Sequence, residues 1–412
     1  MTIEKIETVI IGGGQAGLAM SYYLGQLGRE HVILERHRVA ERWRSERWDS
    51  LTFQSPNWNI HLPGLAFQAA DPDAFSSRDD ILGFIESYAA FIHAPLRLGL
   101  AATTLRQTPD LSHLIVETQA SLFEAKNVVI ATGPFHVPVD PLAFGGTALH
   151  LHSSQYRNPQ RLPPGAVLVI GSGNSGAQIA EELCSAGRRV YLSVSKHGRI
   201  PRRYRGKDYS WWYFALGDAD TTVDQRQNEQ PSALITGVRG GDDLDLRRLA
   251  ADGVVLLGRV LGGQSGRLTI SPDLSENLAR GNASLIEFTQ RADEHIARNG
   301  LEFPTSERAD VPRNPKEVTD PVLTLDLAAA GISSIIWANG FRYDFNWIDL
   351  PIFANGTMSS GRVPEHKRGI TKVRGVYFLG LPWLYKRKSA FLHGVGEDAE
   401  YLAEQIAADV RP

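Results

Sequence analysis

The sequence predicts an α/β fold in which helices cover mostly parallel sheets. A short β-branched strand, a glycine cluster and a helical pattern follow one another twice, first from Thr8 and again from Val167. The first glycines of the two units, Gly12 and Gly171, are roughly 160 residues apart, about the length of one domain. The G-x-G-x-x-G spacing of each cluster is typical of a dinucleotide-binding turn. We therefore expect two Rossmann-like domains in one chain.

Length and composition narrow the functional classes. The chain has 412 residues, enough for two or three domains, and a formal net charge of −3. Nucleic-acid binding needs a basic excess, so we expect no such partner. The single cysteine, Cys184, excludes an intrachain disulfide and a CxxC redox pair, and no residues have metal-ligand spacing. No apolar run reaches about 18 residues and the first residues do not resemble a signal peptide, so we expect a soluble cytoplasmic protein.

The order of the strands predicts that the second domain is inserted in the first. We expect the first domain in residues 1–160 and 334–412, and the second, with an insertion, in residues 161–333. The apolar strand Ser334–Gly340 is similar to Val128–Gly133, and for that reason we place both strands in the first sheet.

Residues 218–305 are the hardest to interpret. They begin with a polar, turn-rich stretch and continue with a strand pattern at Val254–Leu257. A helical pattern follows from Leu274 to Ala297, and another closes the chain from Gly396 to Ala408.

The first glycine unit has the features of a flavin dinucleotide site. Gly12 permits a tight turn, Gly14 lets a pyrophosphate approach the backbone, and Gly17 allows close packing of helix on strand. The start of the following helix offers free N–H groups to the phosphates. The next strand ends at Glu35, whose carboxylate can accept both ribose hydroxyls of an adenosine.

The second glycine unit has the features of a nicotinamide dinucleotide site. Gly171, Gly173 and Gly176 repeat the spacing, but the next strand runs into Lys196 and Arg199 instead of an acid. Cations there favour the 2′-phosphate of NADPH. The alternative is that both are solvated surface charges. A flavin reduced by a nicotinamide explains the two units together, because hydride transfer brings the two rings into contact.

Further motifs lie outside the glycine units. They are Arg47–Leu51, Leu62–Gly64, Ala131–Pro134, Phe144–Gly146 with His152–Pro159, Ile335–Arg342, Gly375–Trp383 and Gly394–Ala399. In this order they resemble the flavin-containing monooxygenases (class B flavoprotein monooxygenases), above all the CzcO-like and YUCCA-like members. The family signature Phe-x-Gly-x3-His-x3-Tyr is matched with two extra residues before His152 and Tyr156. The resemblance covers nearly the whole chain and implies a structural role for His152.

The resemblance implies an FAD-dependent, NAD(P)H-consuming monooxygenase. Such an enzyme inserts one atom of O2 into a small organic substrate through a C4a-(hydro)peroxyflavin. The implied cofactors are FAD and NADPH, with NADH as an alternative because Ser195 stands where many relatives have arginine. Gln54 stands where the family often has an asparagine near the flavin and is the candidate catalytic residue; the alternative is an amide that caps a loop.

The candidate cofactor-binding residues come from the glycine units and the matched motifs. They are Gly12, Gly14, Gln15, Ala16, Gly17, Glu35, Arg36, Trp43, Arg47, Trp48, Thr132, Gly133, Gly171, Gly173, Asn174, Ser175, Gly176, Lys196, Arg199, Asn339 and Gly380.

Several alternatives stay open. Besides a monooxygenase, the sequence allows a flavin-dependent NAD(P)H reductase or oxidase without oxygen insertion, or a non-catalytic flavoprotein. Heteroatom oxidation, Baeyer–Villiger insertion and oxidative decarboxylation are all compatible with the motifs. The aromatic run Tyr209–Phe214 is either a substrate-channel wall or, as we expect, buried packing. A homodimer is the default expectation for the assembly, and no membrane association is expected.

Overall fold

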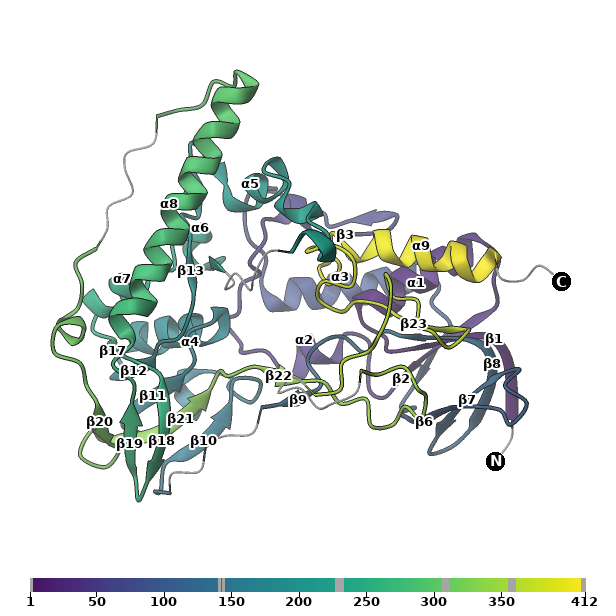
Figure 1. Ribbon diagram of the computed structural model, residues 1–412, viewed down its shortest axis with the longest axis horizontal. Helices are drawn as coiled ribbons and strands as arrows, with labels where there is room; N and C mark the ends of the chain where they lie inside the picture. Colours follow the sequence, from purple (N-terminus) through teal and green to yellow (C-terminus); the bar gives the residue numbers. More distant parts are fainter. Residues whose placement is uncertain are drawn as a thin grey trace.

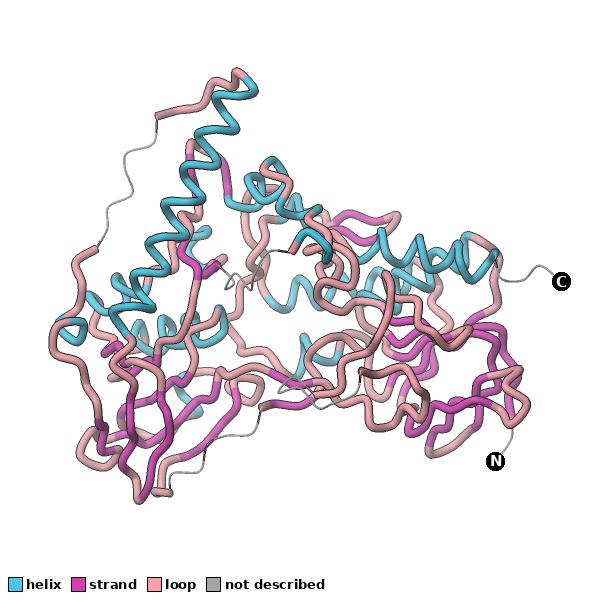
Figure 2. Tube along the Cα trace, viewed as in Figure 1, coloured by secondary structure: helices cyan, strands magenta, loops and turns pink. Residues whose placement is uncertain are grey.

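The computed structural model describes residues 3–139, 142, 145–226, 233–305, 312–354 and 361–408. Two sheets lie beside each other, one at the lower right and one at the lower left of Figure 1. Strands therefore gather at two places in the molecule, and helices cover the upper side of both in Figure 2. Phe144, the first residue of the matched family signature, lies outside the described residues.

The first sheet is mixed and has the strand order β5-β2-β1-β8-β7-β6, with β23 also paired to β8. Strand β1 is parallel to β2 and β8, whereas β7 is antiparallel to both β6 and β8. One edge of β8 is shared, because β7 pairs with its first half and β23 with its second half. The strands are β1 (Ile3–Ile11), β2 (His31–Glu35), β5 (Leu96–Leu98), β6 (Ala102–Gln107), β7 (Leu114–Thr118), β8 (Leu122–Ile130) and β23 (Val376–Phe378).

The second sheet is parallel throughout and has the order β10-β21-β11-β12-β17. Its strands β17, β12, β11 and β21 repeat the order of β5, β2, β1 and β8 in the first sheet. Apolar clusters lie on both of its faces, so its central strand is buried along its whole length. The strands are β10 (Leu149–His152), β11 (Ala166–Ile170), β12 (Val190–Ser193), β17 (Val255–Leu257) and β21 (Ile332–Trp337).

One strand prediction is wrong. We placed Ser334–Gly340 in the first sheet, but β21 pairs with β11 and β10 in the second. Strand β10 also lies in the second sheet, although the predicted boundary at residue 160 put it in the first domain. The physical reason is a tertiary contact: Gly12 packs against Ala131, which follows β8, and Gly171 packs against Ala338, which follows β21. The sequence of an apolar strand is compatible with either sheet, so composition alone does not show which turn it lies beside.

Local chemistry accounts for the start of one of the longer helices. Helix α3 starts at a capping box in which the Asp80 N–H donates to Ser77 Oγ at 3.2 Å and the Ser77 N–H donates to Asp80 Oδ2 at 2.9 Å. Both helices predicted near 274 and 396 are confirmed. The helices are α1 (Gln15–Gln26), α2 (Glu41–Ser45), α3 (Arg78–Phe91), α4 (Asn174–Ser185), α5 (Tyr209–Ala215), α6 (Val238–Gly241), α7 (Leu246–Ala251), α8 (Leu274–Asn299) and α9 (Val395–Ala408).

Short elements connect the two sheets and build the part between them. Strands β9 and β22 pair antiparallel where the chain passes between the sheets, as Figure 1 shows. The 3-10 turns are η1 (Asn57–Asn59), η2 (Pro159–Arg161), η3 (Asp218–Asp220), η4 (Val223–Gln225) and η5 (Lys316–Val318). The remaining strands are β3 (His61–Leu62), β4 (Leu65–Ala66), β9 (Val137–Pro138), β13 (Gly198–Arg199), β14 (Arg203–Tyr204), β15 (Lys207–Asp208), β16 (Ala233–Leu234), β18 (Val260–Gln264), β19 (Arg267–Ile270), β20 (Thr324–Asp326) and β22 (Phe341–Arg342).

Residues 218–305 contribute both to the second sheet and to a separate apolar cluster. The predicted strand at 254–257 is β17. Trp212 of α5 is fully buried against Phe288 of α8, so the expected packing role holds for this part of the aromatic run. Among the described residues, no helix has the length and apolar character needed to span a bilayer.

Candidate functional site

The first glycine turn has the geometry that each of its glycines predicts. Gly12 has a φ of +114°, and a Cβ there would lie 2.5 Å from the carbonyl oxygen of Ala131, after β8. A Cβ on Gly17 would collide with the backbone oxygen of Gly12, so only glycine lets α1 pack on β1. At Gly14, by contrast, no atom lies within 4 Å of the Cβ position. The open side of the turn is therefore at Gly14, where α1 begins.

Glu35 lies against this turn from the end of β2. Its Oε2 accepts the Gly13 N–H at 2.8 Å, and its Oε1 accepts the His37 N–H at 2.9 Å. The sequence indicates Glu35 as a site residue but does not indicate that its carboxylate also holds the turn. Each carboxylate oxygen can accept a further hydrogen bond, so Glu35 still has acceptor capacity for a ligand. Arg36, the next residue, is exposed.

The second glycine turn repeats the backbone geometry of the first. Gly171 has a φ of +105°, and its Cβ position lies 2.5 Å from the carbonyl oxygen of Ala338, after β21. Gly176 packs on Gly171 as Gly17 does on Gly12, and the Cβ position at Gly173 is open. Ser175 lies exposed at the start of α4. The two turns are thus the same structure built twice.

The second turn differs at the position that corresponds to Gly13. Here the buried Ser172 occupies it, and its Oγ accepts the Ser195 N–H at 3.0 Å. The hydroxyl replaces the acid of the first turn by linking the turn directly to the backbone after β12. Carboxylate contacts to this part of the turn are absent among the residues that the structure describes.

The predicted cations at the second turn separate. Lys196 is exposed and forms no ion pair with a described residue. Arg199 is buried, with its Nε 2.6 Å from Asp245 Oδ2 and its Nη1 3.1 Å from Asn282 Oδ1. Arg199 is thus not the solvated surface charge that we weighed as an alternative, and its guanidinium already has partners inside the protein.

The side chain of Asn174 also has a partner that the sequence did not indicate. Its amide donates to the Ala233 carbonyl at 3.2 Å and accepts the Ile235 N–H at 2.8 Å. Gln178, one turn later in α4, donates to the Ile235 carbonyl at 2.7 Å. Both amides therefore hold the segment around β16 against the start of α4.

In each sheet a histidine forms hydrogen bonds with residues that follow the strand beside the glycine turn. This strand is β8 in the first sheet and β21 in the second. After β8, the Asp344 N–H donates to His136 Nδ1 at 3.0 Å, so Nε2 carries the proton and donates to the Gly133 carbonyl at 2.7 Å. Nε2 also lies 3.0 Å from Thr132 Oγ1. Burial lowers the pKa of His136, which favours this neutral form. The sequence does not indicate a role for His136, since a lone histidine carries no signal.

The counterpart after β21 is His152 of the family signature. Its Nδ1 accepts the Ser154 N–H at 3.2 Å, so Nε2 donates to the Gly340 carbonyl at 3.1 Å. Asn339, the matched neighbour of Gly340, lies on the same loop after β21. Tyr156 donates to Glu182 Oε2 at 2.8 Å and is fully buried. These contacts agree with the structural role expected for His152.

The segment after α2 brings an arginine among aromatic rings. The guanidinium carbon of Arg47 lies 5.8 Å from the centroid of Trp43 and 5.2 Å from that of Phe135. Burial lowers the pKa of Arg47, and no carboxylate of a described residue lies within ion-pair distance. Trp48, in contrast, is buried in the apolar cluster of the second sheet. Gln54 is half-buried, and its amide forms no hydrogen bond with any described residue.

The C-terminal segment crosses the start of α1. Gln15 Nε2 donates to the Ala390 carbonyl at 2.6 Å. A Cβ on Gly380, the residue two positions after β23, would lie 2.6 Å from the Cβ of Ala16. Gln15, Ala16 and Gly380, which the sequence assigned to one site, are therefore brought together by the structure.

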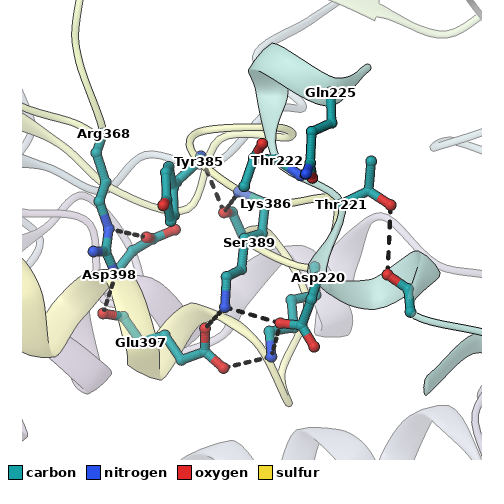
Figure 3. Close-up of polar contacts among 12 residues, drawn as sticks. Asp220, Thr221, Thr222, Gln225, Arg368, Tyr385, Lys386, Ser389, Glu397 and Asp398 are labelled. Atoms are coloured by element: carbon teal, nitrogen blue, oxygen red, sulfur yellow. Dashed lines mark hydrogen bonds and ion pairs between the residues drawn. The ribbon is translucent and has the colours of Figure 1, made fainter. Parts of the chain in front are cut away.

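A four-residue charge cluster ties this C-terminal segment to η3, as Figure 3 shows. Lys386 Nζ lies 2.9 Å from Asp220 Oδ1 and 2.8 Å from Glu397 Oε2. Lys388 makes ion pairs with the same two carboxylates. The hydrogen bond from Lys386 holds the pKa of Asp220 below its ordinary value. The cluster is not evident from the sequence, because Asp220 lies 166 residues before Lys386 in the chain.

Comparisons with known proteins agree with this geometry. Residues 9–212 match the family of pyridine nucleotide-disulphide oxidoreductases. An uncharacterized CzcO-like oxidoreductase of Geobacillus kaustophilus is 32% identical over 97% of this chain and 98% of its own length. A probable indole-3-pyruvate monooxygenase, YUCCA4 of Arabidopsis thaliana, is 31% identical over 97% of this chain and 89% of its own.

The chain belongs to the flavin-containing monooxygenase family. It is therefore an oxidoreductase. A flavin-containing monooxygenase from Stenotrophomonas maltophilia has the same fold, with a TM-score of 0.67 over 99% of this chain and 100% of its own, at 18% identity.

The chain lacks the pair of cysteines that the name of the matched pyridine nucleotide-disulphide oxidoreductase family suggests. A CxxC dithiol requires two cysteines, whereas this chain has only Cys184. Its thiol donates to the Asp252 carbonyl at 3.3 Å, at the end of α7 and away from both glycine turns. Dithiol chemistry within one chain is therefore excluded. Within the described residues, no group of His, Cys, Asp and Glu side chains could hold a metal ion.

Proposed function

We propose that this chain is an FAD-dependent monooxygenase that consumes NAD(P)H and inserts one atom of O2 into a small organic substrate. The observation that carries the proposal is the pair of glycine turns. Both lie at the C-terminal ends of parallel strands, and both have open space at their second glycine. One such turn suits one dinucleotide, and two in one chain suit a flavin and its reductant.

We assign the FAD domain to the first sheet and the NAD(P)H domain to the second. The NAD(P)H domain is inserted in the FAD domain, and the chain crosses between them at the paired strands β9 and β22. The support is the repeated strand order, in which the two glycine turns follow the equivalent strands β1 and β11. In this division the domain boundaries lie at β9 (Val137–Pro138) and β22 (Phe341–Arg342), and no longer at residues 160 and 334.

FAD would bind at the first turn. The free N–H groups at the start of α1 face the open side at Gly14 and suit a pyrophosphate. Glu35 would accept the ribose hydroxyls, and Arg47 would pair with a phosphate because no carboxylate of a described residue neutralises it. The further contacts that we propose come from Gly12, Gln15, Ala16, Gly17, Arg36, Trp43, Thr132, Gly133 and Gly380. Asn339 follows β21 and lies beside Gly171, so we assign it to the second turn instead.

NAD(P)H would bind at the second turn. Its pyrophosphate would lie at Gly173, with the N–H groups of α4 and the exposed Ser175 hydroxyl as donors. Lys196 would meet the 2′-phosphate of NADPH. The backbone N–H groups of Asn174 and Gly176 remain part of this site, whereas we no longer assign Arg199 a phosphate because Asp245 neutralises it.

When bound, FAD supplies the two-electron transfer from the nicotinamide and the reaction with O2. Overall, substrate, O2, NAD(P)H and a proton give the oxygenated product, NAD(P)+ and water. The protein contributes orientation and the exclusion of water. Trp43 and Phe53, whose ring centroids lie 5.7 Å apart, form an apolar wall beside Arg47. The amide of Gln54, next to Phe53, has no hydrogen-bond partner among the described residues and would donate a hydrogen bond to the reacting oxygen.

The purified chain gives a direct test. We expect a yellow protein whose flavin absorbance bleaches with NADPH under anaerobic conditions and returns with O2. A monooxygenase then couples NADPH consumption to product formation with little hydrogen peroxide released. Stoichiometric peroxide with every compound of a substrate panel would instead identify an oxidase, and a colourless protein that stays colourless after incubation with FAD would overturn the proposal.

A further inference from the structure

Two buried polar atoms lack a hydrogen-bond partner among the described residues at the junction of α5 and the segment before α9. They are the hydroxyl oxygen of Tyr213 and Nε2 of His393. The two rings are T-shaped to each other, with centroids 6.3 Å apart. Tyr213 itself is 7% exposed. Buried polar groups are almost always hydrogen-bonded, so a pair of unsatisfied ones on facing elements indicates a ligand-binding position.

Aromatic rings surround this pair. The Phe214 and Phe391 centroids lie 5.2 Å and 5.6 Å from that of His393, and Trp58 lies 6.3 Å from Phe214. Phe391 is 47% exposed and Trp58 is 39% exposed, so the aromatic surroundings extend from the buried polar atoms to the surface. A flat apolar molecule suits such walls.

The site offers no free charge. Burial lowers the pKa of His393 to about 3, and burial raises the pKa of Tyr213, so both groups are neutral at pH 7. The Arg387 guanidinium carbon lies 5.3 Å from the Tyr213 ring centroid, and its Nη1 lies 3.8 Å from Asp218 Oδ2. Lys388 is paired with Glu397. Hydrogen bonding by neutral groups therefore favours an uncharged ligand over a carboxylate.

The segment that carries His393 lies against the start of α1, at the proposed FAD site. Ala390, three residues before His393, is hydrogen-bonded to Gln15 at the start of α1. Tyr213 belongs to α5, which follows β12 of the second sheet in the chain. Neither residue belongs to a glycine turn or to the motifs used above to assign FAD and NAD(P)H contacts.

We infer that Tyr213 and His393 bind the polar group of the substrate, an uncharged aromatic molecule that carries one hydrogen-bonding oxygen or nitrogen. This inference rests on the proposed function, since it assigns the substrate position of the same enzyme. The Tyr213 hydroxyl donates to the polar group, and His393 Nε2 makes the second hydrogen bond. Phe214, Phe391 and Trp58 contact the rings of the substrate.

Three naphthalene probes of similar shape test this inference. 2-Acetylnaphthalene carries a neutral carbonyl, 2-naphthoate carries a charge, and 2-isopropylnaphthalene carries no polar group. Calorimetric titration of the flavin-loaded protein is expected to show the acetyl probe binding at least about tenfold more tightly than the naphthoate. Tyr213→Phe and His393→Phe should each weaken the acetyl probe by about 3- to 10-fold and leave the isopropyl probe unchanged.

Tyr209→Phe is the matched control, because it removes a hydroxyl from the same helix one turn earlier; it should leave all three affinities unchanged. Two outcomes would overturn this inference and leave the proposed function intact. One is equal affinity for the naphthoate and the acetyl probe. The other is an affinity for the acetyl probe that neither substitution changes, in a protein that still reduces its flavin with NADPH. A colourless chain that still selects the acetyl probe through Tyr213 would overturn the proposed function but support this site.

Discussion

The two glycine turns have the same backbone geometry but different side chains beside them. In both, the first glycine packs against the carbonyl oxygen of a residue just after a neighbouring strand. The Cβ position of Gly12 lies 2.5 Å from the Ala131 oxygen after β8, and that of Gly171 lies 2.5 Å from the Ala338 oxygen after β21. A histidine then holds the glycine two residues further along in each case. Turn geometry is therefore a requirement of strand, helix and loop packing, and it is independent of which ligand binds.

The difference lies in one side chain beside each turn. A carboxylate, Glu35, receives the Gly13 N–H in the first turn, whereas the Ser172 hydroxyl receives the Ser195 N–H in the second. The first turn thus carries a negative charge, which in our proposal faces the adenosine end of FAD. The second presents neutral groups with Lys196 beside them, which is compatible with an additional phosphate. Small substitutions at equivalent positions should separate the two functions.

The largest effect is expected from Gly14→Ala and Gly173→Ala. Each backbone is in an ordinary extended conformation and each Cβ position is open, so the fold tolerates the methyl group. The methyl group would occupy the position where we expect a pyrophosphate. Gly14→Ala should weaken FAD binding about 10- to 100-fold, whereas Gly173→Ala should retain the flavin and lose reduction by NADPH to the same degree.

Flavin absorbance and anaerobic bleaching measure the two effects separately. Gly25→Ala is the control, since its Cβ position in α1 is also open. It should keep both cofactors and gain up to about 1 kcal/mol of stability from helix propensity. If Gly173→Ala lost flavin and Gly14→Ala kept it, the assignment of the two turns would be reversed.

A smaller effect is expected from the side chains that distinguish the turns. Glu35→Ala removes a charged acceptor from the Gly13 N–H and should lower the free energy of unfolding of the apoprotein by about 2 kcal/mol. Ser172→Ala removes a neutral acceptor and should cost about 1 kcal/mol. Urea denaturation compares them. Only Glu35→Ala should also weaken FAD binding; equal loss of FAD in both variants would contradict the separation of the sites.

Lys196→Ala sharpens the distinction between the two nucleotides. We expect KM for NADPH to rise about fivefold while KM for NADH changes little, because only NADPH carries the 2′-phosphate. Steady-state kinetics with both nucleotides checks this. Lys5→Ala, at the opposite end of β1 from the first turn, is the control. Equal changes in both KM values would remove the phosphate role from Lys196.

The smallest effect concerns the charge cluster that joins η3 to the C-terminal segment. Its hydrogen bond from Lys386 lowers the pKa of Asp220 below the ordinary 3.8, so its stabilisation is present above that pH and is lost as the pH falls further. Asp220→Asn should therefore reduce the loss of Tm between pH 6 and pH 3, by a small amount for an exposed pair. Asp224→Asn, in η4, is the control. An unchanged pH profile would mean that the cluster contributes no measurable stability.

Much of the site was accessible from local sequence patterns. Gly12, Gly14 and Gly17 each have the packing that their spacing predicts, and the strand before them and the helix after them are confirmed. Glu35 was found because it follows a strand at the expected distance. These features are local: a turn, its flanking strand and its helix lie within a few dozen residues, and the conformational demand falls on glycine itself.

What depended on distant contacts was missed or misassigned. Strand β21 was placed in the wrong sheet, since apolar strands of similar composition pair equally well with either. Arg199 was taken for a ligand contact or a surface charge, but Asp245, just before α7, pairs with it. His136 gave no signal, because its role is set by Asp344, about 200 residues later.

The sequence by itself determined that two dinucleotide-type turns exist in one chain of this family, because glycine spacing and strand–helix alternation are properties of short segments. Only the tertiary structure decided which strand closes each sheet, which cations are neutralised and which polar atoms are left unsatisfied between α5 and the C-terminal segment. Those outcomes depend on partners that chain folding brings together, and the free energy of a buried charge or hydrogen bond is set by its partner in space.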